Sequence, residues 1–551
     1  MSETLLAGLI CVPVVLILEI VVLGKVPFGR PLEYLLVVNL VIAVLSLLLT
    51  WRYRGAFKSI IHQSWLGTCN CWNETTWIQR LTFLLGIFIQ LAATCYGAWN
   101  SPWSVDELSY QIPQAIQPYQ DGRLGPVQAN VIWADSYPRA VALLYYWTLQ
   151  LTHSDVGFHP VNGAFGFIFI LATYVAARRT GLGIGWALMA AGIVPTAPVF
   201  AYLNTIGYID MSVGGISAAA LAMALPERSR GWSWGSCISC FICCVLALWM
   251  KFTTIALISV IVVYRIILII DATLQKLIKQ KTIEINPRLP NFLLLSVFML
   301  ILAFVPYIRT WQKYGSPVYP IRLKVGNHVI FNGPIDTALF GRMNDRPFYE
   351  RFVVYWVDWD EKLTTDSPGS FGPLFAIGML VPTIVCLIMA LYYVHRSWLL
   401  LVVVFWMVLL LPEFHVPRYA LYILLPGALS AVWIGQSLHP RILSFSWCCV
   451  LLLLAIYNSS IFGVEIINAV KWQQSFNISL LTENRNRPIV DKVVSFNERT
   501  PAPSTRQALY KIMKPGETLI GAVHGYQTLL HDPRYQYRVE HRPAKPWPHL
   551  P

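Results

Sequence analysis

Residues 81–113 read LTFLLGIFIQLAATCYGAWNSPWSVDELSYQIP, and this stretch decides the class of the fold. Residues 81–99 carry no charge and are long enough to cross a hydrocarbon layer of about 30 Å, which takes about 20 helical residues. Because backbone amides cannot stay unpaired in lipid, this segment must be a helix. Two adjacent acids, Asp106 and Glu107, follow it directly. Acids at such a depth are costly unless they have partners or chemistry to perform.

The rest of the chain repeats this apolar pattern. Of its 551 residues, 56% are hydrophobic and 13% are charged, against about 25% charged in an average soluble chain. We therefore predict an all-α polytopic membrane protein with about thirteen membrane-spanning helices. The predicted spans are 5–24, 33–51, 81–99, 161–177, 183–200, 209–225, 236–250, 252–270, 291–308, 372–394, 398–412, 418–437 and 443–462.

Lysine and arginine collect in alternate loops and predict a cytoplasmic N-terminus. This topology places segments 100–160, 309–371 and 463–551 outside. The basic residues that set it are Arg52, Arg54, Lys58, Arg80, Arg178, Arg179, Arg228, Arg230, Lys276, Lys279, Lys281, Arg288, Arg396 and Arg441. The net charge of +13 is thus scattered between spans, so we expect no nucleic-acid partner. No phosphate-binding glycine loop of the nucleotide-binding kinds occurs.

The spans and loops suggest a division of the chain into parts. In the first outside loop, apolar and aromatic residues of 130–151 recur at helical spacing, which predicts helices lying along the membrane surface. Residues 515–530 read as a turn, a strand and a helix, so the tail is expected to be a small α/β segment. The expected parts are 1–80 with two helices and an inside loop, 81–310 as a helical module that includes the outside loop 100–160, 311–371 as a second outside loop, 372–462 with the last helices, and 463–551 as an outside tail domain.

Several polar residues at the outer ends of spans admit two interpretations each. Asp106 with Glu107 is either a general base for a hydroxyl group or a solvated loop start. Arg139 is either a phosphate ligand or an interfacial anchor. Lys251 either pairs with a phosphate or snorkels to the surface. Asp210 opens a span and either caps it or takes part in a site.

Taken together, these residues predict one site, because the topology puts them all on one membrane face. Asp135, Arg309, His415 and Arg418 fall on the same face. Acids and cations at the outer leaflet, without a nucleotide site, fit a lipid-linked sugar phosphate: cations hold the phosphate while a carboxylate deprotonates an acceptor hydroxyl. The alternative is a secondary transporter or lipid-linked-sugar flippase, whose polar residues should lie near the midplane in two matching halves. A structural subunit without catalysis is a third reading.

Six landmarks between residues 100 and 430 resemble the GT-C superfamily of integral-membrane glycosyltransferases. The similar branch is the bacterial one that includes protein O-mannosyltransferase-like enzymes and the lipid A aminoarabinose or galacturonic acid transferases. The landmarks are VDELSYQIPQAIQPYQDGRL from 105, GYID from 207, ALWMKFTT from 247, RTWQKYGSPVYP from 309, PGSFGPLF from 368 and PRYALYILLP from 417.

This resemblance implies a GT-C-like fold and an inverting hexosyl- or pentosyltransferase of the bacterial inner membrane, with its active site on the extracytoplasmic face. The donor would be a polyprenyl-phosphate sugar and the acceptor a lipid, glycan or protein. Asp106 would be the catalytic base and Glu107 a helper. Lys251, Arg139, Arg418 and His415 would lie near the donor phosphate, and Tyr110, Asp135, Asp210, Arg309 and Tyr319 would position substrate.

The resemblance implies no obligate metal, with a divalent cation as an option, and no tight oxygen-ligand spacing occurs in the chain. Two positions depart from the family pattern. Gln111 stands where a histidine is frequent, and a glutamine side chain can neither take up a proton as a base nor carry a charge. Ser316 stands where the family has asparagine, a milder change because both residues favour turns.

Overall fold

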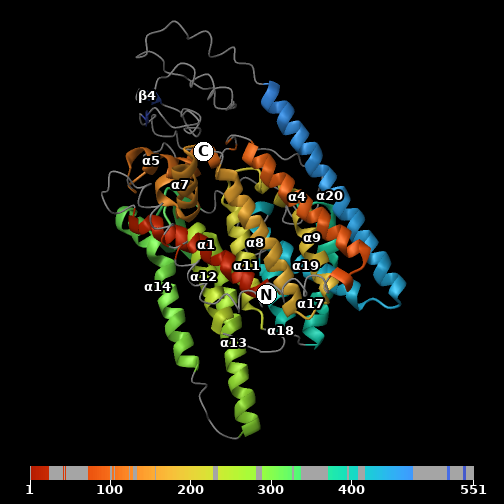
Figure 1. Ribbon diagram of the computed structural model, residues 1–551. Coiled ribbons are helices and arrows are strands. Elements are labelled where there is room, and N and C mark those ends of the chain that lie inside the picture. The colour runs from red at the N-terminus through yellow and green to blue at the C-terminus, as the bar shows by residue number, and fades with distance from the viewer. Residues whose placement is uncertain are drawn as a thin grey trace.

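The computed structural model is a helical bundle with short strands at one end (Figure 1). It describes residues 2–23, 41, 44, 72–99, 102, 104, 106–122, 124–127, 133–154, 157–226, 234–280, 288–325, 328–336, 370–393, 396–407, 416–475, 518–521 and 538–541. All statements below concern these residues.

The first half of the chain forms helices and short helical turns, in the following order. They are α1 (Ser2–Leu23), α4 (Trp77–Trp99), η1 (Glu107–Gln111), α5 (Pro113–Asp121), α6 (Trp133–Ser136), α7 (Ala140–Thr152), α8 (Phe158–Arg179), α9 (Ile184–Ile193), η3 (Val194–Thr196), α10 (Pro198–Leu203), α11 (Asp210–Ala224), α12 (Trp234–Met250), η4 (Phe252–Thr254) and α13 (Ile255–Gln280).

The second half continues the bundle and adds the strands. Its elements are α14 (Arg288–Tyr314), β1 (Ile321–Val325), β2 (His328–Phe331), β3 (Ile335–Asp336), η6 (Leu374–Leu380), α17 (Val381–Tyr393), α18 (Arg396–Met407), η8 (Pro417–Ile423), α19 (Leu424–Ser437), α20 (Arg441–Ser475), β4 (Thr518–Gly521) and β5 (Arg538–His541).

Five described segments are long and apolar enough to cross a membrane, so the predicted class of a multi-pass helical membrane protein is confirmed. They are Trp77–Trp99, Phe158–Arg179, Leu294–Tyr314, Pro417–Ser437 and Arg441–Val464. The other predicted spans coincide with apolar helices, except 33–51, which lies almost wholly outside the described residues, and the last part of 398–412, which is described only to residue 407. The span predicted at 183–200 is broken into α9, η3 and α10, because Pro195 and Pro198 cannot continue a helix's hydrogen bonds.

The core of the bundle is built around α11, which packs against α8 and α12. All of its residues are buried, and many of them are glycine, alanine or serine. A Cβ atom at Gly215 would lie 2.4 Å from the backbone oxygen of Phe165, so only glycine allows α8 to come this close. Small residues at such contacts let helices in a membrane pack backbone to backbone. The start of α11, which carries Asp210, is therefore rigidly placed.

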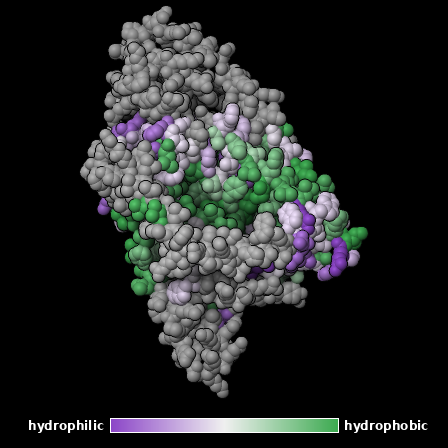
Figure 2. Space-filling model, in the orientation of Figure 1, coloured by the Kyte–Doolittle hydropathy of each residue, from purple (hydrophilic) through white to green (hydrophobic). Residues whose placement is uncertain are grey.

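Helix α1 crosses the bundle from one end to the other. Glu3 at its start makes a 2.8 Å ion pair with Arg179 at the end of α8, and its body packs against α7 and α8. In Figure 1, α1 runs obliquely across the front, away from the starts of α4 and α20. On the face drawn in Figure 2, hydrophobic residues gather over the middle of the molecule around a hollow, as expected of a lipid-facing belt.

One end of the bundle, called the site end below, carries two of the shorter helices of the first half of the chain. Helices α5 and α7 lie there, beside the C-terminal ends of α4 and α14 (Figure 1). The helix predicted within 130–151 is present as α6 and α7, interrupted at Pro138. The second predicted outside loop contains a feature that hydropathy did not reveal: a sheet of order β2-β1-β3, with β1 antiparallel to β2 and parallel to β3.

The C-terminal tail is described only at two strands. β4 pairs in parallel with β5, in register from Thr518 with Arg538 to Gly521 with His541. The strand expected within 515–530 is therefore present. The helix expected after that strand lies outside the described residues.

Candidate functional site

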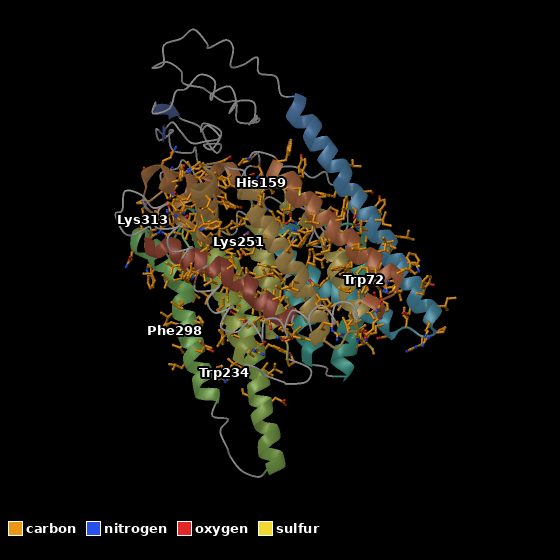
Figure 3. The ribbon with its side chains drawn as sticks, in the orientation of Figure 1. Trp72, His159, Trp234, Lys251, Phe298 and Lys313 are labelled. Atoms are coloured by element: carbon orange, nitrogen blue, oxygen red, sulfur yellow. The ribbon has the colours of Figure 1, made fainter. Side chains whose placement is uncertain are left out.

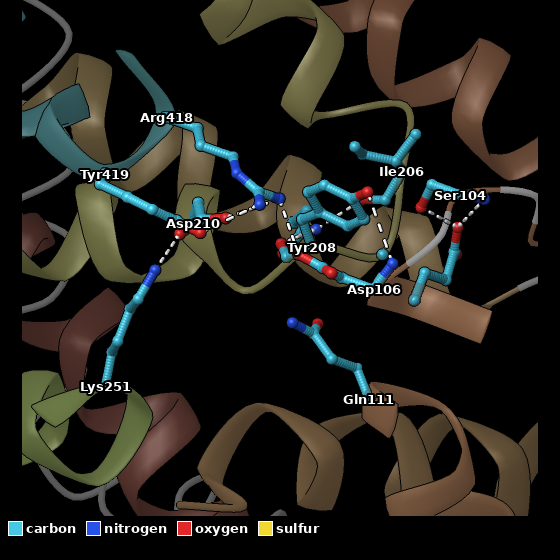
Figure 4. A network of polar contacts seen from close by, with 12 residues as sticks. Ser104, Asp106, Gln111, Ile206, Tyr208, Asp210, Lys251, Arg418 and Tyr419 are labelled. Atoms are coloured by element: carbon cyan, nitrogen blue, oxygen red, sulfur yellow. Dashed lines mark hydrogen bonds and ion pairs between the residues drawn. The ribbon is translucent and has the colours of Figure 1, made fainter. Parts of the chain in front are cut away.

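Four charged side chains from four segments meet at the site end and form what we call the charge-balanced cluster: Asp106, Asp210, Lys251 and Arg418 (Figure 4). Arg418 Nη1 lies 2.8 Å from Asp106 Oδ2 and 3.8 Å from Asp210 Oδ2. Lys251 Nζ lies 2.7 Å from Asp210 Oδ1. Two carboxylates therefore face two cations, and the cluster carries no net charge.

Aromatic rings fix the two cations of this cluster. The guanidinium carbon of Arg418 lies 4.6 Å from the Tyr208 ring centroid and 4.9 Å from that of Tyr419. Lys251 Nζ lies 3.7 Å from the Tyr419 centroid. Such contacts favour a cation held out of bulk water. Arg418 also donates a 3.0 Å hydrogen bond from Nη2 to the Tyr419 hydroxyl, so its orientation is determined from several sides.

Asp106 is the most accessible member of the cluster. Its side chain is 26% exposed, against 10% for Arg418 and 5% for Asp210. Its Oδ2 is taken by Arg418, whereas Oδ1 accepts no hydrogen bond from any described residue. Figure 4 shows the Asp106 side chain beside Arg418 and Tyr208, and the Tyr208 hydroxyl accepts a hydrogen bond from the Asp106 backbone N–H at 3.4 Å. One carboxylate oxygen is thus held while the other remains open to a substrate.

Glu107 points away from this cluster and into the protein. Its side chain is 0% exposed, and Oε2 accepts hydrogen bonds from Ser104 N at 3.1 Å and Ser104 Oγ at 2.7 Å. Oε1 lies 2.5 Å from His159 Nε2, and His159 Nδ1 lies 2.6 Å from the carbonyl oxygen of Gly97. Burial alone would raise the pKa of the Glu107 carboxyl, but His159 and Ser104 lower it below its usual value. Glu107 therefore ties the turn that carries Asp106 to Ser104 and His159 and is not exposed at the surface.

His159→Leu is expected to lower the free energy of unfolding by about 3–5 kcal/mol, because it leaves a buried carboxylate without its partner. Glu107→Gln should lower it less, since the amide still bonds to both Ser104 and a neutral imidazole. Chemical unfolding of the purified variants in mixed micelles measures the difference. Equal, small losses for both variants would show that the pair does not hold this turn.

A second group, the basic cluster, surrounds Asp135 in α6. Around one carboxylate it gathers three cations, which leaves two positive charges in excess. The contacts of the Asp135 carboxylate are Arg139 Nη2 at 2.5 Å, Lys313 Nζ at 2.6 Å, Arg309 Nη2 at 3.7 Å, Tyr314 Oη at 3.0 Å and Val127 N at 2.9 Å. Arg309 and Lys313 are 45% and 47% exposed, so both can still reach an incoming anion.

Electrostatics keep the basic cluster ionised near neutral pH. Burial raises the pKa of the Asp135 carboxyl, but the hydrogen bonds from Lys313 and Val127 and the charges of Arg139 and Arg309 prevail and lower it to about 2. Burial and the charge of Arg309 lower the pKa of Arg139 to about 10, still well above neutrality. Tyr314, the residue directly after Lys313, stacks its ring on that of Tyr319 with the centroids 4.1 Å apart.

Aromatic side chains connect the two clusters. The Tyr110 ring, on the same turn as Asp106, meets the edge of Tyr137 at 5.7 Å. Tyr137 follows α6 and lies 4.7 Å from the ring of Trp133 in the same helix as Asp135. Burial and the Asp106 charge raise the pKa of Tyr110 well above its usual value, so its hydroxyl stays protonated. Figure 3 shows His159, Lys251 and Lys313 in the upper half of the view, toward the site end.

The structure thus divides the residues singled out from the sequence into two sets. Asp106, Asp210, Lys251 and Arg418 lie together, whereas Asp135, Arg139 and Arg309 form the basic cluster. Asp210 is the first residue of α11 and binds both cations instead of capping the helix with its side chain. His415 lies outside the described residues.

Sequence reasoning did not single out several residues that hold these side chains in place, among them His159, Lys313, Tyr208 and Tyr419. The position of Lys313 beside Arg309 could have been predicted, because Lys313 follows Arg309 by four residues and so lies on the same helix face. Tyr208 and Tyr419 lie inside the landmark segments. His159 carried only the weak signal of a titratable residue at the start of a span. Within the described ranges, no group of three or more His, Cys, Asp or Glu residues is arranged to hold a metal ion, and the metal requirement stays a prediction.

Comparison with known proteins gives a likeness in backbone only. No family model matches the chain, and no curated protein matches its sequence. The crystal structure of ArnT from Cupriavidus metallidurans bound to undecaprenyl phosphate aligns at 11% identity with a TM-score of 0.48, over 84% of this chain and 85% of that one. The crystal structure of the same protein in the apo state aligns at 12% identity with a TM-score of 0.48, over 83% of this chain and 85% of that one. Likeness at this level decides neither family nor activity.

Proposed function

We propose that the chain is a glycosyltransferase that moves a sugar from a polyprenyl-phosphate donor to an acceptor hydroxyl, with inversion at the anomeric carbon, at the extracytoplasmic face of the bacterial inner membrane. The observation that carries the proposal is the open Oδ1 of Asp106, on a carboxylate fixed by Arg418, at the same end of the bundle as a group of cations with excess positive charge. A base and an anion site at one end of an apolar bundle are what transfer from a lipid phosphate requires.

The reaction follows from these groups. The acceptor O–H gives its proton to Asp106 Oδ1, and its oxygen attacks the anomeric carbon from the side opposite the phosphate. The bond between that carbon and the phosphate oxygen breaks, and its electron pair leaves on the phosphate. Attack from the opposite side inverts the configuration. Glu107 and Asp210 do not touch the reacting atoms in this proposal. Glu107 holds the turn that carries Asp106, and Asp210 holds Lys251 and Arg418.

Charge balance supports a phosphate position at the basic cluster. The donor is a phosphodiester, and the product phosphate gains a further negative charge as it leaves. Lys251 and Arg418 already face two carboxylates, whereas Arg139, Arg309 and Lys313 share one. The second set thus stabilises a developing anion better, because its charge is not yet compensated. The sequence analysis expected Lys251 and Arg418 to lie near the donor phosphate. In this proposal these two residues instead orient Asp106 and the sugar.

Lys313→Gln is expected to lower kcat/KM for the donor about tenfold, because it removes one charge-assisted hydrogen bond at a partly exposed position. The loss should shrink as salt is added, since exposed charges are screened. Lys324→Gln removes the same charge from an exposed side chain on strand β1 that makes none of the contacts to Asp135 given above, and it should leave kcat/KM within twofold of wild type. Equal effects of the two variants would place the phosphate elsewhere.

The direct test incubates the purified protein with a panel of polyprenyl-phosphate sugars and a mixture of acceptors, and follows donor consumption. Consumption by the wild type and its loss in Asp106→Asn support the proposal. No consumption of any donor would overturn it.

A further inference from the structure

One buried polar atom close to Asp106, Oε1 of Gln111, accepts no hydrogen bond from the described residues and has no role in the mechanism above. Gln111 ends the turn η1 that begins after Asp106, and it is 3% exposed. Its Oε1 is buried and accepts no hydrogen bond from the described residues. Its Nε2 lies 3.5 Å from the Tyr110 hydroxyl, at the limit of hydrogen bonding. A buried amide is normally satisfied on both atoms, so this one is arranged for a group that the protein itself does not supply.

The amide also points to where that group would be. In Figure 4, the Gln111 side chain extends from its helix toward Asp106, Tyr208 and Asp210. A sugar whose anomeric carbon approaches the Asp106 carboxylate brings its ring hydroxyls within reach of this side chain. A hydroxyl can donate to Oε1, and a neighbouring hydroxyl can accept from Nε2, so an amide matches two adjacent hydroxyls.

The charges around Gln111 discriminate between classes of sugar. Both nearby carboxylates are already paired with cations, so no surplus negative charge awaits an ammonium group. Lys251 and Arg418 are likewise already paired with these carboxylates, so neither provides an uncompensated positive charge for a sugar carboxylate. A charged sugar would be desolvated here without a counter-charge, which is costly, whereas hydroxyls need only hydrogen bonds.

We propose that Gln111 is a specificity-determining residue that binds ring hydroxyls of a neutral sugar on the donor, so that neutral donors are preferred over amino sugars and uronic acids. This rests on the proposed function and names its substrate class. A buried acceptor left unpaired rejects substrates that lack the matching donor.

The experiment measures kcat/KM for three polyprenyl-phosphate donors: a neutral hexose, an amino sugar and a uronic acid. The wild type should prefer the neutral donor at least tenfold. Gln111→Met, of similar size, should lower kcat/KM for the neutral donor at least tenfold and leave the charged donors unchanged. Gln111→Glu should improve the amino-sugar donor relative to the neutral one, and it keeps the test open if Gln111→Met does not fold.

The matched control is Gln120→Leu, which removes an amide from the surface helix α5 and should keep the wild-type preference. Wild-type preference for a charged donor, or unchanged selectivity in both Gln111 variants, would overturn the inference while the transferase function stands. Full activity of Asp106→Asn, or no turnover of any donor by the wild type, would instead overturn the proposed function and the inference with it.

Discussion

Asp106→Asn is expected to lower kcat for sugar transfer about 10²- to 10⁴-fold, the contribution of a positioned general base. The amide keeps the volume of the carboxylate and still accepts a hydrogen bond from Arg418, but it cannot take the acceptor's proton. KM for the donor should change little, because the proposed function has the basic cluster, and not Asp106, bind the phosphate. Steady-state kinetics of the purified variant, together with its thermal unfolding, separate lost chemistry from lost folding.

The matched control for this variant is Asp121→Asn. It removes an exposed carboxylate at the end of α5, on the same outer segment, and should retain wild-type kcat. Asp106→Glu should keep part of the activity, because the base is present but displaced by one methylene. A kcat for Asp106→Asn within threefold of wild type would show that Asp106 is not the base.

Arg418→Met is expected to abolish transfer and to lower the free energy of unfolding by about 3–5 kcal/mol. Methionine fills most of the space but leaves Asp106 without its ion pair and near a second carboxylate, that of Asp210, whose Oδ2 lies 3.8 Å from the same Arg418 nitrogen. The stability and activity of Arg418→Lys should lie between those of the wild type and of Arg418→Met, because lysine keeps the charge but lacks the planar guanidinium that can bind two carboxylates at once. Unfolding in mixed micelles and donor turnover measure the two effects.

The same prediction can be tested by a double-mutant cycle. Adding Asp210→Asn to Arg418→Met removes one of the two facing carboxylates, so part of the lost stability should return. The combined loss would then be smaller than the sum of the single losses, as expected for residues in one network. Additive losses would show that Arg418 and Asp210 act independently.

The membrane class and most helices were predictable because hydropathy depends on local composition alone. The span 81–99 is present as Trp77–Trp99, and 443–462 lies within Arg441–Ser475. The sheet at 321–336 was not predictable in this way, because its strands are short and mostly exposed and their pairing is set by tertiary contacts.

The site was predictable as a set of residues but not as contacts. A common topology brings Asp106, Asp210, Lys251 and Arg418 to one end, and this required only the alternation of spans. The divergence of Asp106 and Glu107 arises because successive residues in a helical turn point in directions roughly 100° apart. The partner of Glu107 is His159, which is 52 residues away in sequence and on another helix. Such a pairing depends on how the helices pack.

The most direct test of the proposed glycosyltransferase is to measure the lipid phosphate that the reaction releases. In proteoliposomes supplied with a polyprenyl-phosphate sugar and acceptor, mass spectrometry counts the polyprenyl phosphate released for each sugar transferred. We predict one free lipid phosphate for each sugar transferred in the wild type and none in Asp106→Asn. Donor that crosses intact to the other leaflet without release of lipid phosphate would contradict the account and identify a transporter.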